Sequence, residues 1–217
     1  MIRLHHVPQA RSFRVLWLME EMGLAFEIVP HSFFDKSLRA PEYLALSPAG
    51  RVPALEIDGL TLFESGAILE YLCETFGPFG RQPGEEERPE WLEWLHFAET
   101  LGQHLAALTQ QHIVLREDWM RSPTVMRLEA KRLEKVLGAV EDVLEGREYV
   151  LASGFSAVDV AIGYGAWIAR RFVRFDALPR VARWLARLEA RPAFRRAALR
   201  DGMAEIYTQD FYEVPDD

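Results

Sequence analysis

The sequence predicts a small α/β domain followed by an all-helical domain. In residues 1–78, short apolar runs alternate with helical patterns in the order βαβαββα. Beyond residue 90, long helical patterns follow one another, and the only strand candidate is the short stretch 149–151. Residues 77–90 are rich in glycine, proline and charge and have no packing period. We therefore expect an α/β domain over residues 1–78, a linker over 79–90 and a helical domain over 91–217.

The elements of the first domain follow from apolar periodicity and turn residues. A helix is expected where apolar residues recur at helical spacing behind Ser12, a suitable N-cap residue, and Gly23 is expected to end it. Asp58-Gly59 lies between two apolar runs, which is a strong hairpin signal. The expected elements are a strand over 1–6, a helix over 12–23, a strand over 26–30, a short helix over 41–46, strands over 52–57 and 60–63, and a helix over 65–75.

The second domain is expected to consist of helices. Ser156 and Asp159 have the spacing of a capping box, with aspartate in place of glutamate, so their first expected role is to begin a helix. An aromatic cluster recurs at i, i+3 and i+6 in Trp91, Trp94 and Phe97. This spacing favours a role in the core or in subunit contacts over a role in a substrate pocket. The expected helices cover 91–116, 124–144, 156–171, 179–190 and 192–199.

The composition disfavours several classes of function. With 25 Lys and Arg against 33 Asp and Glu, the net charge of -8 argues against binding to nucleic acid. No apolar stretch approaches the roughly 20 residues that cross a bilayer, and residues 1–4 show no secretory leader, so neither membrane insertion nor export is expected. The single cysteine, Cys73, rules out an internal disulfide and a CxxC pair, and it is expected to be core, with a reactive thiol as the alternative. A cytoplasmic location is therefore expected.

Pro53 stands inside the apolar run "RVPALEIDG", where a strand would need a backbone N–H. Proline in a strand belongs to an edge, a strand start or a turn, often with a cis peptide bond. The next apolar run ends at Glu64 and Ser65, where a helix is expected to begin. A helix N-terminus can hold an anion, while the alternative is that Ser65 is a plain N-cap and Glu64 a first-turn charge.

This order of elements and motifs resembles the cytosolic glutathione transferase family over nearly the whole chain. The resemblance rests on "RSFRVLWLMEEMGLAFEIV", "SPAGRVPALEIDG", "LFESGAILEYL", "GFSAVDVAIGY" and "RWLARLEARPAF", which occur in the family's order. Within the family, the chain looks most similar to bacterial and fungal members. The resemblance implies a thioredoxin-like first domain, a homodimer and a second-substrate pocket contributed by the helical domain, with candidate lining residues Gln111, His112, Arg116 and Trp119.

The resemblance also implies a glutathione site in the first domain. It implies that the Val52-Pro53 bond is cis, so that the main chain of Val52 pairs with the cysteinyl part of glutathione like an added strand. Ser65 and the first amides of its helix would receive the γ-glutamyl α-carboxylate, and Glu64 would pair with the ammonium. Arg51 would reach the glycyl carboxylate, or it is simply solvated. A valine-proline pair by itself could also begin a strand that binds no ligand.

The family's usual thiol-activating residue is missing. A thiol pKa of about 8.5 leaves only a few per cent thiolate at neutral pH, and lowering it by two units takes about 2.7 kcal/mol. Gln9 and Ala10 stand where the family has serine or cysteine. The catalytic candidates are therefore Ser12, Gln9 and Arg11, with the role of an ordinary helix cap as the alternative for Ser12.

The leading interpretation is an enzyme, a dimeric glutathione transferase of detoxification that directs the glutathione thiolate at a small hydrophobic electrophile. The first alternative is a glutathione-dependent reductase of disulfides or peroxides. The second is a glutathione-binding or interaction module without catalysis, which Gln9 and Ala10 permit. Glutathione is the expected co-substrate. No metal is expected, because the adjacent His5 and His6 face opposite sides of a strand and no third ligand lies at a useful spacing.

Overall fold

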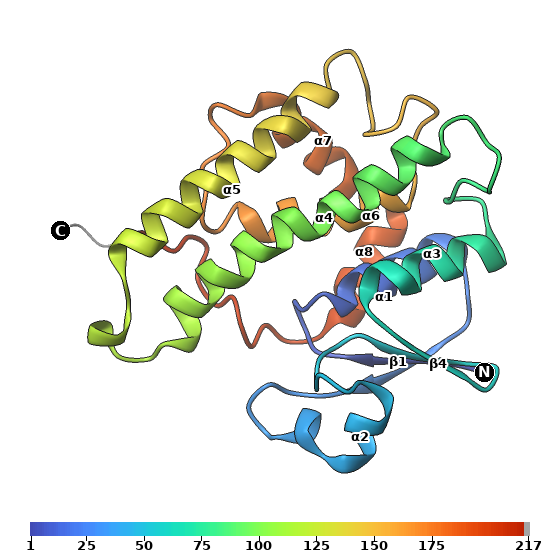
Figure 1. Ribbon diagram of the computed structural model, residues 1–217, viewed down its shortest axis with the longest axis horizontal. Helices are drawn as coiled ribbons and strands as arrows, with labels where there is room; N and C mark the ends of the chain where they lie inside the picture. The colour runs from blue at the N-terminus through green and yellow to red at the C-terminus, as the bar shows by residue number, and fades with distance from the viewer. Residues whose placement is uncertain (215–217) are drawn as a thin grey trace. The chain divides into compact units, whose positions relative to one another are not determined.

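The computed structural model describes residues 1–214 and is shown in Figure 1. By the packing of its main chain, the described part of the protein divides into two compact units, one of Met1–Arg88 with Ala190–Glu205 and the other of Pro89–Glu189 with residues 206–214. The segment 190–205 thus belongs with the first unit, although it follows the helical region in sequence. The expected division at residues 79–90 remains a prediction, and the last positions of the expected helical domain, 215–217, lie outside the described residues.

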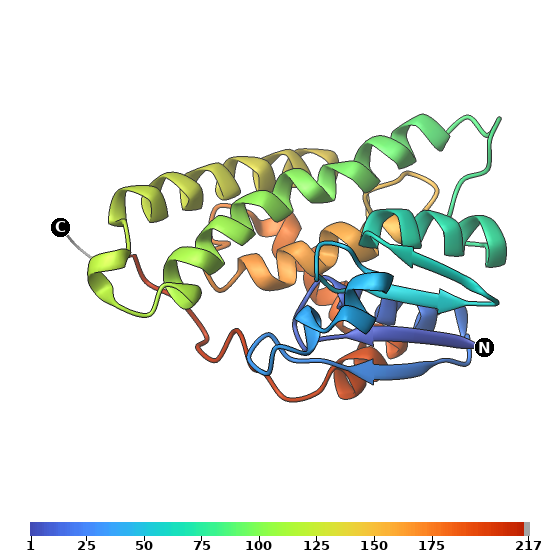
Figure 2. The same ribbon diagram turned by 60° about the horizontal axis from the view of Figure 1, so that its bottom comes forward.

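The first unit contains a four-stranded sheet (Figure 2). Its strands are β1 (Ile2–His6), β2 (Glu27–Pro30), β3 (Ala54–Ile57) and β4 (Leu60–Phe63). They lie in the order β2-β1-β3-β4, and the register places Leu4 opposite both Ile28 and Leu55. β1 and β2 are parallel, whereas β3 is antiparallel to both of its neighbours. Parallel neighbours need a crossover, which the helix between β1 and β2 supplies.

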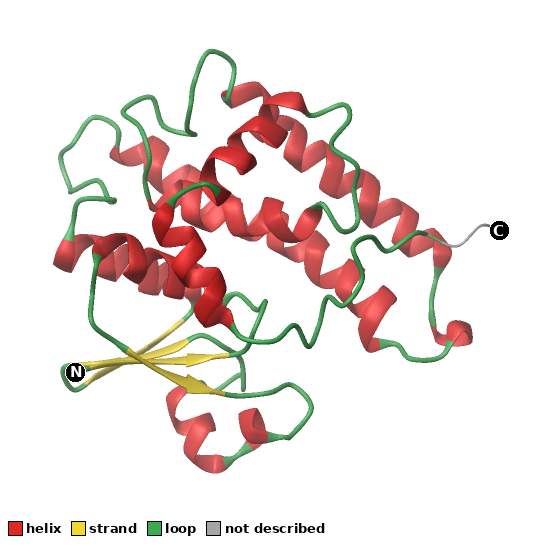
Figure 3. Cartoon of the chain, turned by 180° about the vertical axis from the view of Figure 1, so that it is seen from behind, coloured by secondary structure: helices red, strands yellow, loops and turns green. Residues whose placement is uncertain are grey.

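Helices cover both faces of this sheet. They are α1 (Ser12–Met22), α2 (Pro41–Leu46), α3 (Ser65–Phe76) and α8 (Pro192–Asp201). α1, α3 and α8 lie on one face and α2 on the other, as Figure 3 shows, and α1 packs against both α3 and α8. Leu4, Leu16, Leu55 and Ile68 are fully buried in this unit, and each such side chain contributes about 1.5–3 kcal/mol to stability. The predicted βαβαββα order is confirmed.

The predicted N-cap role of Ser12 is wrong. Arg11 is the N-cap of α1, without a side-chain cap bond, and Ser12 is the first helical residue. The Ser12 hydroxyl instead accepts from the Val7 N–H and donates to the Val7 carbonyl, both at 3.3 Å. The hydroxyl therefore ties the preceding loop to the helix. Gly23 ends the helix with φ of 66°, as predicted.

The second unit, within the described residues, is built from helices. They are α4 (Arg88–Thr109), α5 (Pro123–Val143), α6 (Ala157–Ala169) and α7 (Pro179–Glu189), with a π turn at Gln110–Val114 and a 3-10 turn at Asp118–Met120. The stretch 149–151 is not a strand. None of the helices formed by residues 1–214 is long and apolar enough to cross a membrane.

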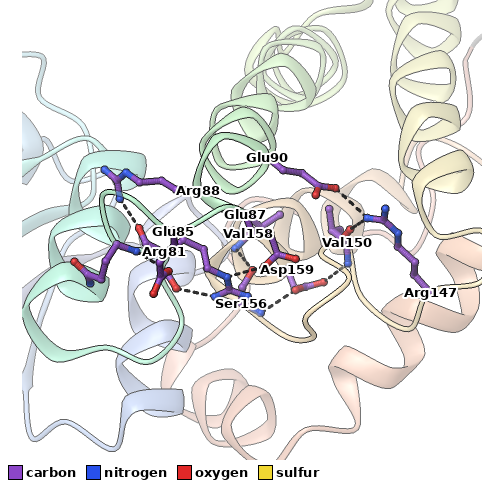
Figure 4. Close-up of polar contacts among 12 residues, drawn as sticks. Arg81, Glu85, Glu87, Arg88, Glu90, Arg147, Val150, Ser156, Val158 and Asp159 are labelled. Carbon is purple, nitrogen blue, oxygen red and sulfur yellow. Dashed lines mark hydrogen bonds and ion pairs between the residues drawn. The ribbon is translucent and has the colours of Figure 1, made fainter.

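The start of α6 is fixed by Ser156 and Asp159 (Figure 4). Ser156 Oγ accepts from the Val158 N–H at 3.2 Å, and Asp159 Oδ2 accepts from the Ser156 N–H at 2.9 Å, so the predicted capping box is confirmed. Asp159 Oδ1 also accepts from the Val150 N–H at 3.1 Å and from Trp184 Nε1 at 2.9 Å. This carboxylate joins α6 to the preceding loop and to α7. Burial raises the pKa of Asp159 to about 6, although its N–H donors favour the ionised form.

Candidate functional site

The chain enters β3 through the Val52-Pro53 bond, which is cis, as the resemblance implied. Tyr43 Oη and Ser47 Oγ donate to the Arg51 carbonyl oxygen at 2.7 and 2.8 Å, so the main chain just before Val52 is anchored. Within residues 1–214, neither the N–H nor the C=O of Val52 has a hydrogen-bond partner. Val52 thus precedes the paired part of β3 with unused backbone groups, which can pair with an extended peptide. The Arg51 side chain is exposed.

The N-terminus of α3 forms the next part of the site. Glu64 precedes the helix with φ of 70° and an exposed side chain, and its carbonyl accepts from the Ile68 N–H at 3.0 Å. The N–H groups of Ser65, Gly66 and Ala67 find no acceptor among the described residues. No acidic residue lies in the first turn, and a Cβ built on Gly66 would meet nothing within 4 Å. These open amides and the helix dipole can receive an anion.

The Ser65 hydroxyl has a charged neighbour that the sequence did not reveal. Arg14 Nη1, from the first turn of α1, donates to Ser65 Oγ at 3.1 Å. Both side chains are buried, with 1% of Arg14 and 3% of Ser65 exposed. The bond joins the N-terminal ends of two helices that pack against each other.

The loop before α1 holds the three catalytic candidates. Gln9 is buried and has a left-handed backbone with φ of 61°, and its N–H donates to both carboxylate oxygens of Asp201 at 3.1 and 3.2 Å. His6 Nε2 lies 3.1 Å from the Asp201 carbonyl oxygen, so the end of α8 fixes this loop. Arg11 is half-buried at the N-cap, whereas Ser12 is fully buried against Val7. Neither Asp201 nor His6 was predicted to hold the loop.

A second polar cluster crosses the sheet of the first unit. His5 Nδ1 lies 2.9 Å from His31 Nε2, and His5 Nε2 lies 2.8 Å from Glu56 Oε1. Burial, and then the nearby His5, lower the pKa of His31. Nowhere in residues 1–214 are three or more His, Cys, Asp or Glu side chains arranged to hold a metal ion.

Cys73 is buried in α3, as predicted for a core residue. Burial raises the pKa of its thiol to about 12, so the thiol is almost entirely protonated at neutral pH. A role as a protein-borne nucleophile is therefore disfavoured.

The residues suggested for the second-substrate pocket differ in their surroundings within the second unit. Gln111 Oε1 accepts from the Ser122 N–H at 2.7 Å, and the His112 ring lies 5.5 Å from the Phe172 ring. Trp119 is 81% exposed. Arg116 is also exposed, and the pocket remains a prediction.

Residues 1–74 match the family model described as "Glutathione S-transferase, N-terminal domain". The chain is similar to glutathione S-transferase 3 of Schizosaccharomyces pombe, with 30% identity over 212 residues that cover 91% of this chain and 87% of the relative. It is also similar to a crystal structure of a glutathione transferase from Pseudomonas putida with one glutathione disulfide bound per subunit, at a TM-score of 0.80 and 29% identity over 91% of this chain and 90% of that one. A glutathione transferase family member from Pseudomonas fluorescens with two glutathione bound gives a TM-score of 0.82 and 28% identity, covering 91% of this chain and 92% of that one.

Proposed function

The chain belongs to the glutathione S-transferase family, and from this premise we propose that it binds glutathione in its first unit and transfers the glutathione thiolate to a small hydrophobic electrophile. The observation that carries the proposal is the presence in that unit of two sets of backbone groups without hydrogen-bond partners among the described residues. These are the N–H and C=O of Val52 and the first three amides of α3. Together they suit a small peptide that carries an anionic end.

Each part of glutathione has a proposed partner. The cysteinyl main chain pairs with Val52 like an added strand, and the γ-glutamyl α-carboxylate binds the α3 amides and the Ser65 hydroxyl. The exposed Glu64 carboxylate pairs with the γ-glutamyl ammonium, and Arg51 reaches the glycyl carboxylate. Pro53 keeps the chain turned at the start of β3.

The loop before α1 is proposed to favour the thiolate. Gln9, Arg11 and Ser12 remain the candidate donors to the sulfur. The burial of Ser12 against Val7 favours Gln9 and Arg11, because the Ser12 hydroxyl already has a donor and an acceptor in the main chain. One donated hydrogen bond and the helix N-terminus would lower the thiol pKa.

Reduction of disulfides is the second candidate function, favoured by the glutathione disulfide bound to the Pseudomonas putida protein and by the two glutathione bound to the Pseudomonas fluorescens protein. In that reaction a glutathione thiolate attacks a substrate disulfide, forms a mixed disulfide and releases one substrate thiolate, which takes up a proton. A second glutathione thiolate then attacks the mixed disulfide at the glutathione sulfur, giving glutathione disulfide and the second substrate thiolate, which also takes up a proton.

We assign the protein to the cytoplasm, to detoxification and to a homodimer on the family pattern. The non-catalytic module remains the alternative from another class.

Thermal melting with and without glutathione tests the binding proposal, because a ligand that binds only the folded state raises the melting temperature. Consumption of a model aryl halide and of a model disulfide then separates the two reactions. If glutathione does not change the melting temperature, both enzymatic hypotheses are overturned. Binding without consumption of either substrate would favour the module.

A further inference from the structure

Ser65 is bonded to a buried cation. Arg14 Nη1 donates to Ser65 Oγ at 3.1 Å, and 1% of Arg14 is exposed. A guanidinium keeps its charge throughout the pH range in which proteins are folded. A positively charged side chain from the first turn of α1 therefore donates directly to the Ser65 hydroxyl. This is the hydroxyl that we propose binds the carboxylate of glutathione.

The Arg14 guanidinium adds to the positive field at two helix N-termini. Arg14 lies in the first turn of α1 and its guanidinium meets the first residue of α3, so it lies near two positive helix ends. Neither helix has an acidic residue in its first turn. A cation at a helix N-terminus is unfavourable for the helix, whereas a bound carboxylate gains from both the cation and the dipoles.

The hydrogen bond also determines what the Ser65 hydroxyl can do. A serine hydroxyl has one proton to donate and accepts through its lone pairs. The Ser65 hydroxyl oxygen already accepts a hydrogen bond from Arg14. The hydroxyl proton finds no acceptor in the described part of the chain. The proton is thus left to donate to a ligand beside the open amides of Gly66 and Ala67. A charged donor polarises the O–H group and strengthens this donation.

From this bond and this charge we infer that Arg14 is a positioning residue for the γ-glutamyl α-carboxylate of glutathione. It holds Ser65 Oγ as an acceptor, directs the hydroxyl proton to the carboxylate and adds its charge to the α3 N-terminus. Its hydrogen bond acts through Ser65 and its charge acts through space, and Arg14 does not itself touch the ligand. The inference rests on the proposed function.

The test compares two unreactive ligands by calorimetry. One is S-methylglutathione, and the other is its analogue in which γ-aminobutyrate replaces the γ-glutamyl group, so that the amine stays and the α-carboxylate is absent. Arg14→Met should raise the Kd of S-methylglutathione about tenfold, which equals about 1.4 kcal/mol, and should change the Kd of the analogue less than about twofold. Arg14→Lys, which keeps a charged donor, should recover most of the affinity.

The matched control is Arg191→Met. Arg191 Nε lies 2.7 Å from Glu21 Oε1, toward the opposite end of α1, so its loss removes a guanidinium from the same unit away from α3. This variant should bind both ligands as the wild type does. An unchanged Kd of S-methylglutathione in Arg14→Met, or equal weakening of both ligands, would overturn the inference while the proposed function stands.

A further pair of variants decides the case if Arg14→Met does not fold. Arg14→Lys should weaken S-methylglutathione at least twofold in the wild-type background and not at all in a Ser65→Ala background, because lysine keeps the charge and alters only the bond to the hydroxyl. Equal losses in both backgrounds would overturn the inference. A wild-type protein that binds neither ligand would remove the proposed function and the inference together.

Discussion

Replacing Asp159 by alanine removes a fully buried carboxylate that accepts three N–H hydrogen bonds, from Val150 at 3.1 Å, Ser156 at 2.9 Å and Trp184 Nε1 at 2.9 Å. Each buried donor left without an acceptor costs about 1–3 kcal/mol. The variant also no longer buries an ionised carboxylate at neutral pH. The rise in the pKa of Asp159 from 3.8 to about 6 means that about 3 kcal/mol of unfavourable free energy is removed with it. The three donors together cost about 3–9 kcal/mol, so we expect Asp159→Ala to lower the free energy of unfolding by about 3 kcal/mol, the middle of the resulting range and a large part of the total of about 5–15 kcal/mol.

Asp159→Asn separates the charge from the hydrogen bonds. An amide oxygen in the Oδ1 position keeps the bonds from Val150 and Trp184, while the NH₂ group faces the Ser156 N–H and loses that bond. At neutral pH the lost bond, about 1–3 kcal/mol, is offset by the removal of the buried charge, so the variant should be close to the wild type.

The pH dependence of that difference follows from the pKa. Burial raises the pKa of Asp159 from 3.8 to about 6, so the folded state holds the proton more tightly than the unfolded state. This tighter proton binding adds to the free energy of unfolding. The contribution is fully present below pH 3.8 and is lost as the pH rises through about 6. The stability advantage of the wild type over Asp159→Asn should therefore be largest at acidic pH and shrink toward neutrality.

Urea unfolding followed by circular dichroism, at several pH values, measures these differences. Asp118→Asn is the control, because Asp118 is 97% exposed in its pair with Arg121 and should change stability by less than about 0.5 kcal/mol. If Asp159→Ala lowers the free energy of unfolding no more than Asp118→Asn does, the Asp159 hydrogen bonds do not stabilise the fold as described. If the difference between wild type and Asp159→Asn grows as the pH rises, the raised pKa of Asp159 is contradicted.

Three further predictions concern the first unit. Ser65→Ala should raise the Kd of glutathione about tenfold by calorimetry, because one charge-assisted hydrogen bond is lost, and an unchanged Kd would count against the site. Ser12→Ala should lower the unfolding free energy by about 1 kcal/mol in urea titrations, because the Ser12 hydroxyl is hydrogen-bonded to the Val7 main chain. Turnover per folded molecule should stay nearly unchanged. A large loss of turnover would instead show that Ser12 contacts the sulfur. Cys73 should resist a thiol reagent in the native protein at about pH 8 and react after denaturation, because burial raises the pKa of its thiol to about 12; rapid native modification would contradict that burial.

The sequence predicted the elements well where local chemistry determines them. Asp58-Gly59 forms the turn between β3 and β4, Gly23 ends α1, and the capping box at Ser156 and Asp159 begins α6. Apolar periodicity and turn residues act over a few positions, so they are visible without the fold. The cis bond before Pro53 came from the family resemblance, since a proline alone is compatible with either isomer.

The contacts that distant segments make in the site were not predictable. The Arg14–Ser65 bond spans 51 positions and the Gln9–Asp201 bond spans 192. In the sequence, Arg14 is simply a polar position on an amphipathic helix, and no local pattern indicates that it is buried. The role of Ser12 was also predicted wrongly. Its hydroxyl forms hydrogen bonds with the main chain of Val7 and not with the amides of its own helix.

A crystal structure of the protein with bound glutathione would show where the tripeptide lies. We expect the cysteinyl N–H and C=O to lie within hydrogen-bond distance of the Val52 main chain, and the γ-glutamyl carboxylate to contact the Ser65 hydroxyl and the α3 amides. A tripeptide bound elsewhere, or bound there with its γ-glutamyl end away from Ser65, would contradict this expectation.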